Sequence, residues 1–107
     1  MDKINEFLKN NYKSYETSIG EFPEVTKRIE CEDGFNISVQ ASEYMYCEPR
    51  INKGWPYSEV ELGFPSKNDD LIDDYAEEPG TIETVYPYVP IEIVNQLIEK
   101  HGGIINN

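Results

Sequence analysis

Six carboxylates lie within ten residues of this chain with no basic side chain among them, and they form its densest group of reactive side chains. They are Asp69, Asp70, Asp73, Asp74, Glu77 and Glu78. A calcium-binding loop places its oxygen ligands at alternate positions around a central glycine. These acids instead come in pairs, and the next glycine is Gly80. We therefore expect no metal at this segment.

Acids four residues apart would lie on one side of a helix and form a negative stripe, similar in sign and density to a nucleic-acid backbone. Like-charge pairs at that spacing destabilise a helix by roughly 0.2–0.5 kcal/mol each. We therefore expect residues 66–80 to form an acidic loop or a short helix. A stripe of this kind predicts binding to a basic protein surface, and the alternative is a solvated loop that maintains solubility.

A second group of side chains combines tyrosine and tryptophan with a single arginine. It consists of Tyr44, Tyr46, Arg50, Trp55, Tyr57, Tyr86 and Tyr88. Tyr, Trp and Arg are the residues most often found at the energetic centres of protein interfaces, so the group predicts a partner-binding surface. Two alternatives stay open. The aromatic rings would cover one end of a sheet, or Arg50 would hold an anionic ligand such as a phosphate beside stacked rings.

The remaining reactive side chains do not predict an enzyme. A cysteine nucleophile needs a nearby base, and the only histidine, His101, lies at the end of a predicted helix beside two glycines. A closed zinc site needs four ligands, which Cys31, Cys47 and His101 do not supply without a carboxylate. We therefore expect no catalytic residue and no cofactor, with both cysteines reduced in the cytosol.

Length and charge set the class of protein and of partner. The chain has 107 residues, 38% of them hydrophobic, and a formal net charge of −12. This length fits a single domain over residues 1–107. The negative charge opposes direct binding of nucleic acid or of an anionic membrane and favours basic protein surfaces. There is no long apolar run, and the N-terminal segment MDKINEFLKN is charged throughout, so we expect a cytoplasmic protein.

The apolar pattern predicts an α+β fold, a small antiparallel sheet of three to four strands flanked by an N-terminal and a C-terminal helix. Apolar residues at spacings of three and four predict helices over residues 3–15 and 90–101. Alternation predicts antiparallel strands within residues 25–64. The last of them, at about 57–64, would place Val60, Leu62 and Phe64 on one side and Tyr57 on the other. Residues 82–89 are expected to form a further extended segment, in which Pro87 favours an edge position.

The register of the first two predicted strands follows from their apolar residues. A three-residue loop, Glu32-Asp33-Gly34, pairs Ile29 with Ile37 and Cys31 with Phe35, and it extends to a pair between Val25 and Ala41. This register puts every apolar side chain on one face, with Gly34 in the left-handed position that such loops need. A two-residue turn would instead set glutamates opposite Phe35 and Ile37.

Three motifs resemble a family of small phage, prophage and plasmid proteins. They are Tyr46-Cys47-Glu48-Pro49-Arg50, Glu61-Leu62-Gly63-Phe64-Pro65 and His101-Gly102-Gly103. The resemblance covers about two-thirds of the chain, without the N-terminal helix, and implies an origin in a mobile genetic element. Small acidic proteins of such elements often inhibit host defence systems, and by this analogy we expect an inhibitor of the anti-CRISPR type.

The hypothesis from the sequence is therefore a non-enzymatic inhibitor that occupies a basic nucleic-acid-binding surface, with a nucleic-acid-guided nuclease as the most natural target. The acids of 69–78 would supply charge and the aromatic residues would supply buried contact. The alternative is a protein that binds or sequesters a nucleotide through Tyr46, Arg50, Trp55, Tyr86 and Tyr88.

Overall fold

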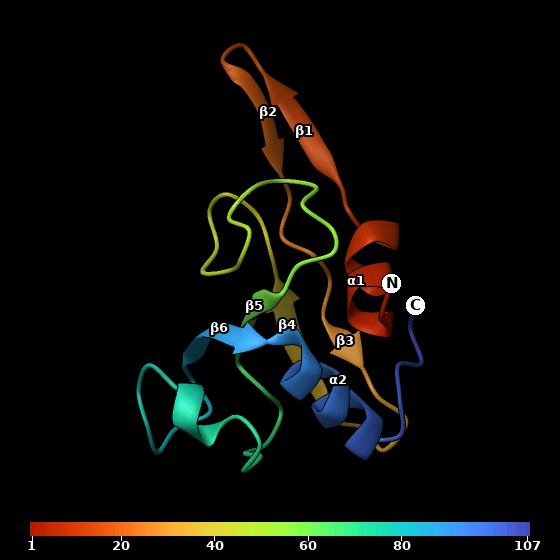
Figure 1. The fold of residues 1–107 in the computed structure, drawn as a ribbon, viewed down its shortest axis with the longest axis vertical. Helices are drawn as coiled ribbons and strands as arrows, with labels where there is room; N and C mark the ends of the chain where they lie inside the picture. The colour runs from red at the N-terminus through yellow and green to blue at the C-terminus, as the bar shows by residue number, and fades with distance from the viewer.

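The computed structural model describes all residues from 1 to 107 and confirms the α+β class, with two helices and two antiparallel sheets. The elements are α1 (Lys3–Asn10), β1 (Ser14–Thr17), β2 (Gly20–Pro23), β3 (Ile29–Glu30), β4 (Asn36–Gln40), β5 (Glu59–Gly63), the 3-10 helix η1 (Asp73–Tyr75), β6 (Val85–Pro90) and α2 (Ile91–Lys100). Strands β3-β4-β5-β6 form one sheet in that order. Strands β1 and β2 form a separate hairpin that projects from one end of the molecule (Figure 1).

Helix α1 is shorter than the predicted segment 3–15. It begins at an Asp2 cap, whose carboxylate accepts the amide of Asn5 at 3.0 Å, and it ends at Asn10. The side chain of Asn11 donates to the Phe7 carbonyl at 2.9 Å, and asparagine competes in this way with the helical backbone. The apolar spacing continues past this end through Tyr12 and Tyr15, which is why it predicted a longer helix.

The hairpin of β1 and β2 was not predicted from the sequence. Tyr15 lies opposite Phe22, and Glu16 lies opposite Glu21. The hydroxyl of Thr17 donates to the Gly20 carbonyl at 3.1 Å and closes the turn. Because this sheet has no further strand, its position depends on contacts of its side chains with the body of the molecule.

The predicted register between β3 and β4 is confirmed at its centre and wrong at one end. Ile29 pairs with Ile37, and the amide of Cys31 donates to the Phe35 carbonyl at 2.8 Å. The pair between Val25 and Ala41 does not form, because β3 contains only two residues and Val25 is 73% exposed. The side chain of Gln40 instead bonds both backbone groups of Thr26, at 2.9 and 2.8 Å.

A bulge separates the two ends of the ladder between β5 and β6. Val60 pairs with Val89 and Leu62 with Tyr86, so two residues of β6 face one residue of β5. The extra residue lets both Tyr86 and Val89 reach the core and leaves Tyr88 outside with a φ of 53°. Strand β6 lies at the edge of the sheet, as Pro87 predicted.

The third predicted strand, at about 57–64, corresponds to the shorter β5, and two residues beside it do not face the side that alternation predicted. The prediction placed Phe64 with Val60 and Leu62, and Tyr57 on the opposite side. Tyr57 is buried and precedes β5, whereas Phe64 follows it, is 51% exposed and has a φ of 51°. The backbone therefore turns at both ends of the five-residue strand, and alternation does not hold there.

Helix α2 agrees closely with the predicted segment 90–101. Val94, Leu97 and Ile98 are buried against the sheet. After the helix, Gly102 has a φ of 94° and donates to the Glu99 carbonyl at 3.0 Å, and Gly103 donates to the Ile98 carbonyl at 3.0 Å. This is a Schellman cap, which needs a left-handed residue at the position of Gly102.

The segment after the cap runs back along the outer edge of β3. Ile104 forms a bridge with Cys31, and the amide of Ile105 donates to the Glu30 carbonyl at 2.9 Å. This pairing satisfies backbone groups that an edge strand would otherwise expose. Neither α1 nor α2 has the length and apolar character that crossing a membrane requires.

Candidate functional site

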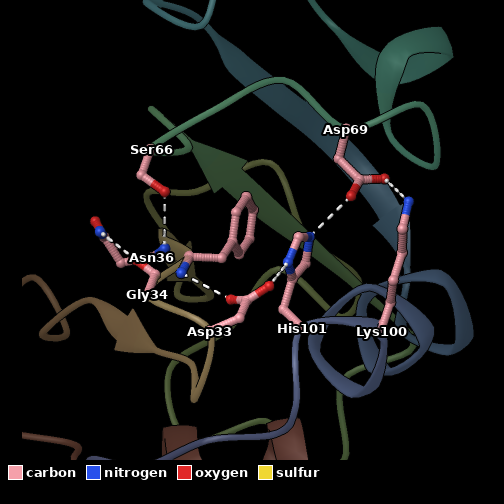
Figure 2. A network of polar contacts seen from close by, with 8 residues as sticks. Asp33, Gly34, Asn36, Ser66, Asp69, Lys100 and His101 are labelled. Atoms are coloured by element: carbon pink, nitrogen blue, oxygen red, sulfur yellow. Dashed lines mark hydrogen bonds and ion pairs between the residues drawn. The ribbon is translucent and has the colours of Figure 1, made fainter.

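Asp69, the first residue of the predicted acidic stripe, is buried in a polar cluster at the end of α2 (Figure 2). Its side chain is 3% exposed. Its Oδ1 accepts hydrogen bonds from the Leu71 amide at 3.0 Å and from Lys100 Nζ at 3.1 Å, while Oδ2 lies 2.9 Å from Nε2 of His101. Asp69 is therefore not part of a solvent-facing stripe.

His101 joins two carboxylates from different parts of the chain. Its Nδ1 lies 2.6 Å from Asp33 Oδ2, opposite the contact of Nε2 with Asp69, and its ring stacks on Phe35 with the centroids 4.0 Å apart. Both ring nitrogens of His101 are thus engaged by carboxylate oxygens, and Lys100 places an ammonium group on the Asp69 side of the cluster.

The carboxylates of this cluster are stabilised in their ionised form. Burial acts to raise the pKa of Asp69, but the hydrogen bonds from Leu71, His101 and Lys100 outweigh it and lower that pKa. The pKa of Asp33 is lowered first by its hydrogen bond with His101 and then by the amide of Phe35. No nitrogen of His101 remains to activate a nucleophile, so the geometry fits a clasp between the β3–β4 loop, segment 66–72 and α2.

The other five predicted acids are exposed and do not form a helical stripe. They are Asp70, Asp73, Asp74, Glu77 and Glu78. The only helical turn in this segment is η1, which is too short to set acids four residues apart on one side. A surface hollow of about 610 Å³ lies in this loop, with Asp73, Asp74 and Tyr86 in its wall. No three acidic, histidine or cysteine side chains come together in a geometry that would hold a metal ion.

Three members of the predicted aromatic group do not lie in a common surface. Tyr57 and Tyr86 are each 1% exposed and belong to the core. The hydroxyl of Tyr57 donates to the Ile51 carbonyl at 2.6 Å and accepts the amide of Gly54 at 2.9 Å. Trp55 is half-buried and packs edge-on against Tyr12, with the ring centroids 5.6 Å apart. Because these three side chains are buried or half-buried, the structure gives no support to the prediction that they contact a partner.

The other members are exposed, and three of them are in contact. The rings of Tyr46 and Tyr88 lie 5.8 Å apart, and the guanidinium of Arg50 lies 5.3 Å from the centre of the Tyr46 ring. The amide of Tyr88 donates to the Tyr46 carbonyl at 3.1 Å. The bulge of β6 is thus fastened to the loop that carries Tyr46. Tyr44, in the same loop, is 52% exposed.

The hairpin adds two residues that were missed in the sequence. Tyr15 stacks on Phe22 at 6.0 Å, and Phe22 stacks on Tyr44 at 6.2 Å. We refer to Tyr15, Phe22, Tyr44, Tyr46 and Tyr88 as the aromatic row. The available signal was the alternation of aromatic and acidic residues on both sides of a short turn, Tyr15-Glu16 before it and Glu21-Phe22 after it.

Comparisons of the chain with family models, characterised proteins and solved structures found no match. The three motifs that suggested a mobile-element family have roles within the fold. His101-Gly102-Gly103 forms the clasp and the cap of α2. The thiol of Cys47 is buried and donates to the Ser42 carbonyl at 3.2 Å, and Gly63 packs between Ser38 and Val85. Of the predicted site residues, these motifs contain only Tyr46 and Arg50.

Proposed function

We propose that this chain is a non-enzymatic binding protein that docks the aromatic row onto a basic surface of another protein. The conformation of Tyr88 is the observation that carries the proposal. Its ring is 42% exposed, and its φ of 53° lies in the left-handed region. That region costs a non-glycine residue about 1–2 kcal/mol. Phe64 shares this strain and exposure, but only the ring of Tyr88 lies against another exposed ring, that of Tyr46. A strained residue that holds its ring within a group of exposed aromatic residues is typical of a binding site.

The charge around the aromatic row supports a basic partner. Glu61 accepts the amide of Tyr46 at 3.0 Å, Glu43 precedes Tyr44, and Glu16 and Glu21 lie in the hairpin. The chain as a whole carries −12. Such a field attracts positively charged surfaces at long range and speeds association with them. The buried aromatic contact would then determine how long the complex lasts.

Within this proposal, the partner is a host defence enzyme with a basic nucleic-acid channel. The resemblance to proteins of mobile elements supports an inhibitor of the anti-CRISPR type, and guided nucleases hold their nucleic acids in positively charged channels. The five exposed acids of 70–78 add negative charge outside the aromatic row. The inhibitor itself contacts neither nucleic acid nor a membrane, and it acts in the cytoplasm.

The nucleotide-binding alternative has less support. It needs a hollow surrounded by the predicted aromatic residues and Arg50. None of the four surface hollows is lined by Tyr46, Arg50 or Tyr88, and Tyr86 faces a separate hollow in the acidic loop. Arg50 also donates to the Glu43 carbonyl at 3.1 Å and lies over the Tyr46 ring, so its guanidinium is already engaged.

The test compares two exposed aromatic residues that share the same unusual backbone conformation. Tyr88 has a φ of 53° and Phe64 a φ of 51°, and they are 42% and 51% exposed. Replacing either with glycine relieves strain and removes one ring, but only Tyr88 belongs to the aromatic row. Binding of each variant to a panel of purified, guide-loaded RNA-guided nucleases is measured by calorimetry, together with inhibition of cleavage.

We expect Tyr88→Gly to weaken binding about 30-fold, which corresponds to the roughly 2 kcal/mol that a central interface residue contributes. Phe64→Gly should leave affinity within about twofold, and raised salt should weaken both complexes. Equal losses in the two variants would contradict the assignment of the aromatic row. A panel in which the wild-type protein binds no nuclease would exclude this class of target.

A further inference from the structure

The β1–β2 hairpin projects from the molecule and has no strand beside it on either edge (Figure 1). All four residues of β1 are exposed, and Ile19 at the turn is 84% exposed, more than any other large apolar side chain. A two-stranded hairpin is marginally stable in water by itself. Here the stacking of Phe22 on Tyr44 and the ion pair of Glu21 with Lys53 connect it to the body, while the amide of Glu24 closes its base by donating to the Lys13 carbonyl at 2.8 Å.

The two faces of the hairpin have different chemistry. Tyr15 and Phe22, the members of the aromatic row that lie in the hairpin, form an opposed pair on one face. On the other face Glu16 lies directly opposite Glu21. Like charges in opposed positions destabilise a strand pair. The only compensating contact is with Lys53, whose Nζ lies 3.7 Å from Glu21 while both side chains are about half exposed.

Residues 14–24 contain three glutamates and no basic residue. This charge opposes insertion of the hairpin into nucleic acid, and it also opposes pairing with the same hairpin of a second copy. A guanidinium placed between Glu16 and Glu21 would replace their repulsion with charge-assisted hydrogen bonds. An apolar contact at the turn would remove Ile19 from water.

We infer that the hairpin is an insertion element that enters a groove of the partner protein, with Ile19 at the apolar end of the groove and an arginine of the partner between Glu16 and Glu21. This inference rests on the proposed function and specifies which element of the inhibitor enters the partner and which side chain it selects. It also assigns a role to a segment that makes no contribution to the four-stranded sheet.

The experiment titrates the isotope-labelled protein with a blocked peptide of alternating arginine and leucine and follows the backbone amides by NMR. Two double variants lose the same charge at different places. One is Glu16→Gln with Glu21→Gln, and the control is Glu92→Gln with Glu99→Gln on α2, where both glutamates are exposed. A third variant, Ile19→Ser, keeps every charge and removes the apolar tip. Hydrogen exchange of the hairpin amides verifies that each variant retains its fold.

For the wild type we expect saturable shifts concentrated in residues 14–24. The hairpin double variant should bind the peptide at least tenfold more weakly and the control less than twofold more weakly, and Ile19→Ser should also weaken binding. Shifts centred on the acidic segment 69–78, equal losses in both double variants, or no saturable shift would overturn the inference.

The same variants separate this inference from the proposed function. If a nuclease of the panel binds and Tyr88→Gly weakens it while the hairpin double variant does not, the hairpin inference fails and the docking of the aromatic row stands. If the peptide binds the hairpin as expected while no nuclease binds, the arginine-selective hairpin stands and the proposed target fails.

Discussion

Replacing Asp69 with asparagine should destabilise the protein far more than the same change at Asp70, its neighbour in the sequence. Each substitution removes one negative charge, so the net charge changes equally. The side chain of Asp69 is buried and contacts Leu71, Lys100 and His101, whereas Asp70 is exposed and has no side-chain hydrogen bond. The difference between the variants therefore measures the buried contacts apart from the general effect of charge.

The expected size follows from the geometry of the clasp. Asparagine keeps an acceptor for the Leu71 amide and for Lys100, which both contact Oδ1, but it places an amide where Oδ2 faces His101. One hydrogen bond to a charged carboxylate is lost, which corresponds to about 2–3 kcal/mol of unfolding free energy. Since small proteins lose about 1–3 kcal/mol per molar of urea, the unfolding midpoint should fall by about 0.7–3 M.

The measurement is urea unfolding followed by the fluorescence of Trp55, the only tryptophan, which is half-buried against Tyr12. Asp70→Asn should unfold at the midpoint of the wild type. If Asp69→Asn also retains the wild-type midpoint, the clasp does not stabilise the fold and the argument from its geometry is refuted. If both variants shift equally, the effect is due to net charge.

Three further results are expected. Hydrogen bonding to His101 lowers the pKa of Asp33, and the hydrogen bonds of Asp69 outweigh its burial and lower its pKa as well. These ionised carboxylates therefore stabilise the fold above the unfolded-state pKa of 3.8, and that stability is lost as the pH falls through their lower folded-state pKa values. Acid unfolding can be followed by circular dichroism, and a profile that Asp69→Asn leaves unchanged would contradict this. Gly102→Ala should lower the thermal unfolding midpoint more than Gly80→Ala. The two positions have φ values of 94° and 89°, but a Cβ at 102 would lie 2.9 Å from Cβ of Glu32, whereas a Cβ at 80 would meet open space. Equal midpoints would mean that backbone strain alone, and not the contact with Glu32, sets the loss of stability. Burial raises the pKa of Cys31 to about 11, so a thiol reagent at pH 8 should modify this residue slowly in the native protein and rapidly in urea, and equal rates would show that the site opens readily.

The parts of the fold that could be predicted from sequence are those where the apolar pattern matches burial. The pairing of Ile29 with Ile37 was determined by alternation together with Gly34 in the loop. The ends of α2 were determined by Pro90, which has the right φ to precede a helix, and by Gly102, which accepts a left-handed conformation. Each of these signals comes from residues close together in the sequence, so it does not depend on contacts with distant parts of the chain.

The parts that could not be predicted depend on contacts between distant residues or on exposed structure. The burial of Asp69 follows from His101, 32 positions further along, and nothing near Asp69 distinguishes it from Asp70. The hairpin has no buried face of its own, so its alternation of aromatic and acidic side chains does not have the apolar period that identifies a strand. In the aromatic group, sequence did not separate the core residue Tyr57 from the exposed Tyr46, because tyrosine suits both environments.

The pairing of the last residues with β3 has a consequence for how the protein forms during synthesis. Asp2 bonds Asn95, Asp33 bonds His101, and the edge of β3 is completed by Ile105. The ends of the chain lie side by side (Figure 1). A nascent chain on the ribosome therefore exposes β3 and the aliphatic face of α1 until residues 91–105 emerge from the exit tunnel. The partners of the hairpin in the body, Tyr44 and Lys53, emerge much earlier than Ile104 and Ile105, which cover the edge of β3.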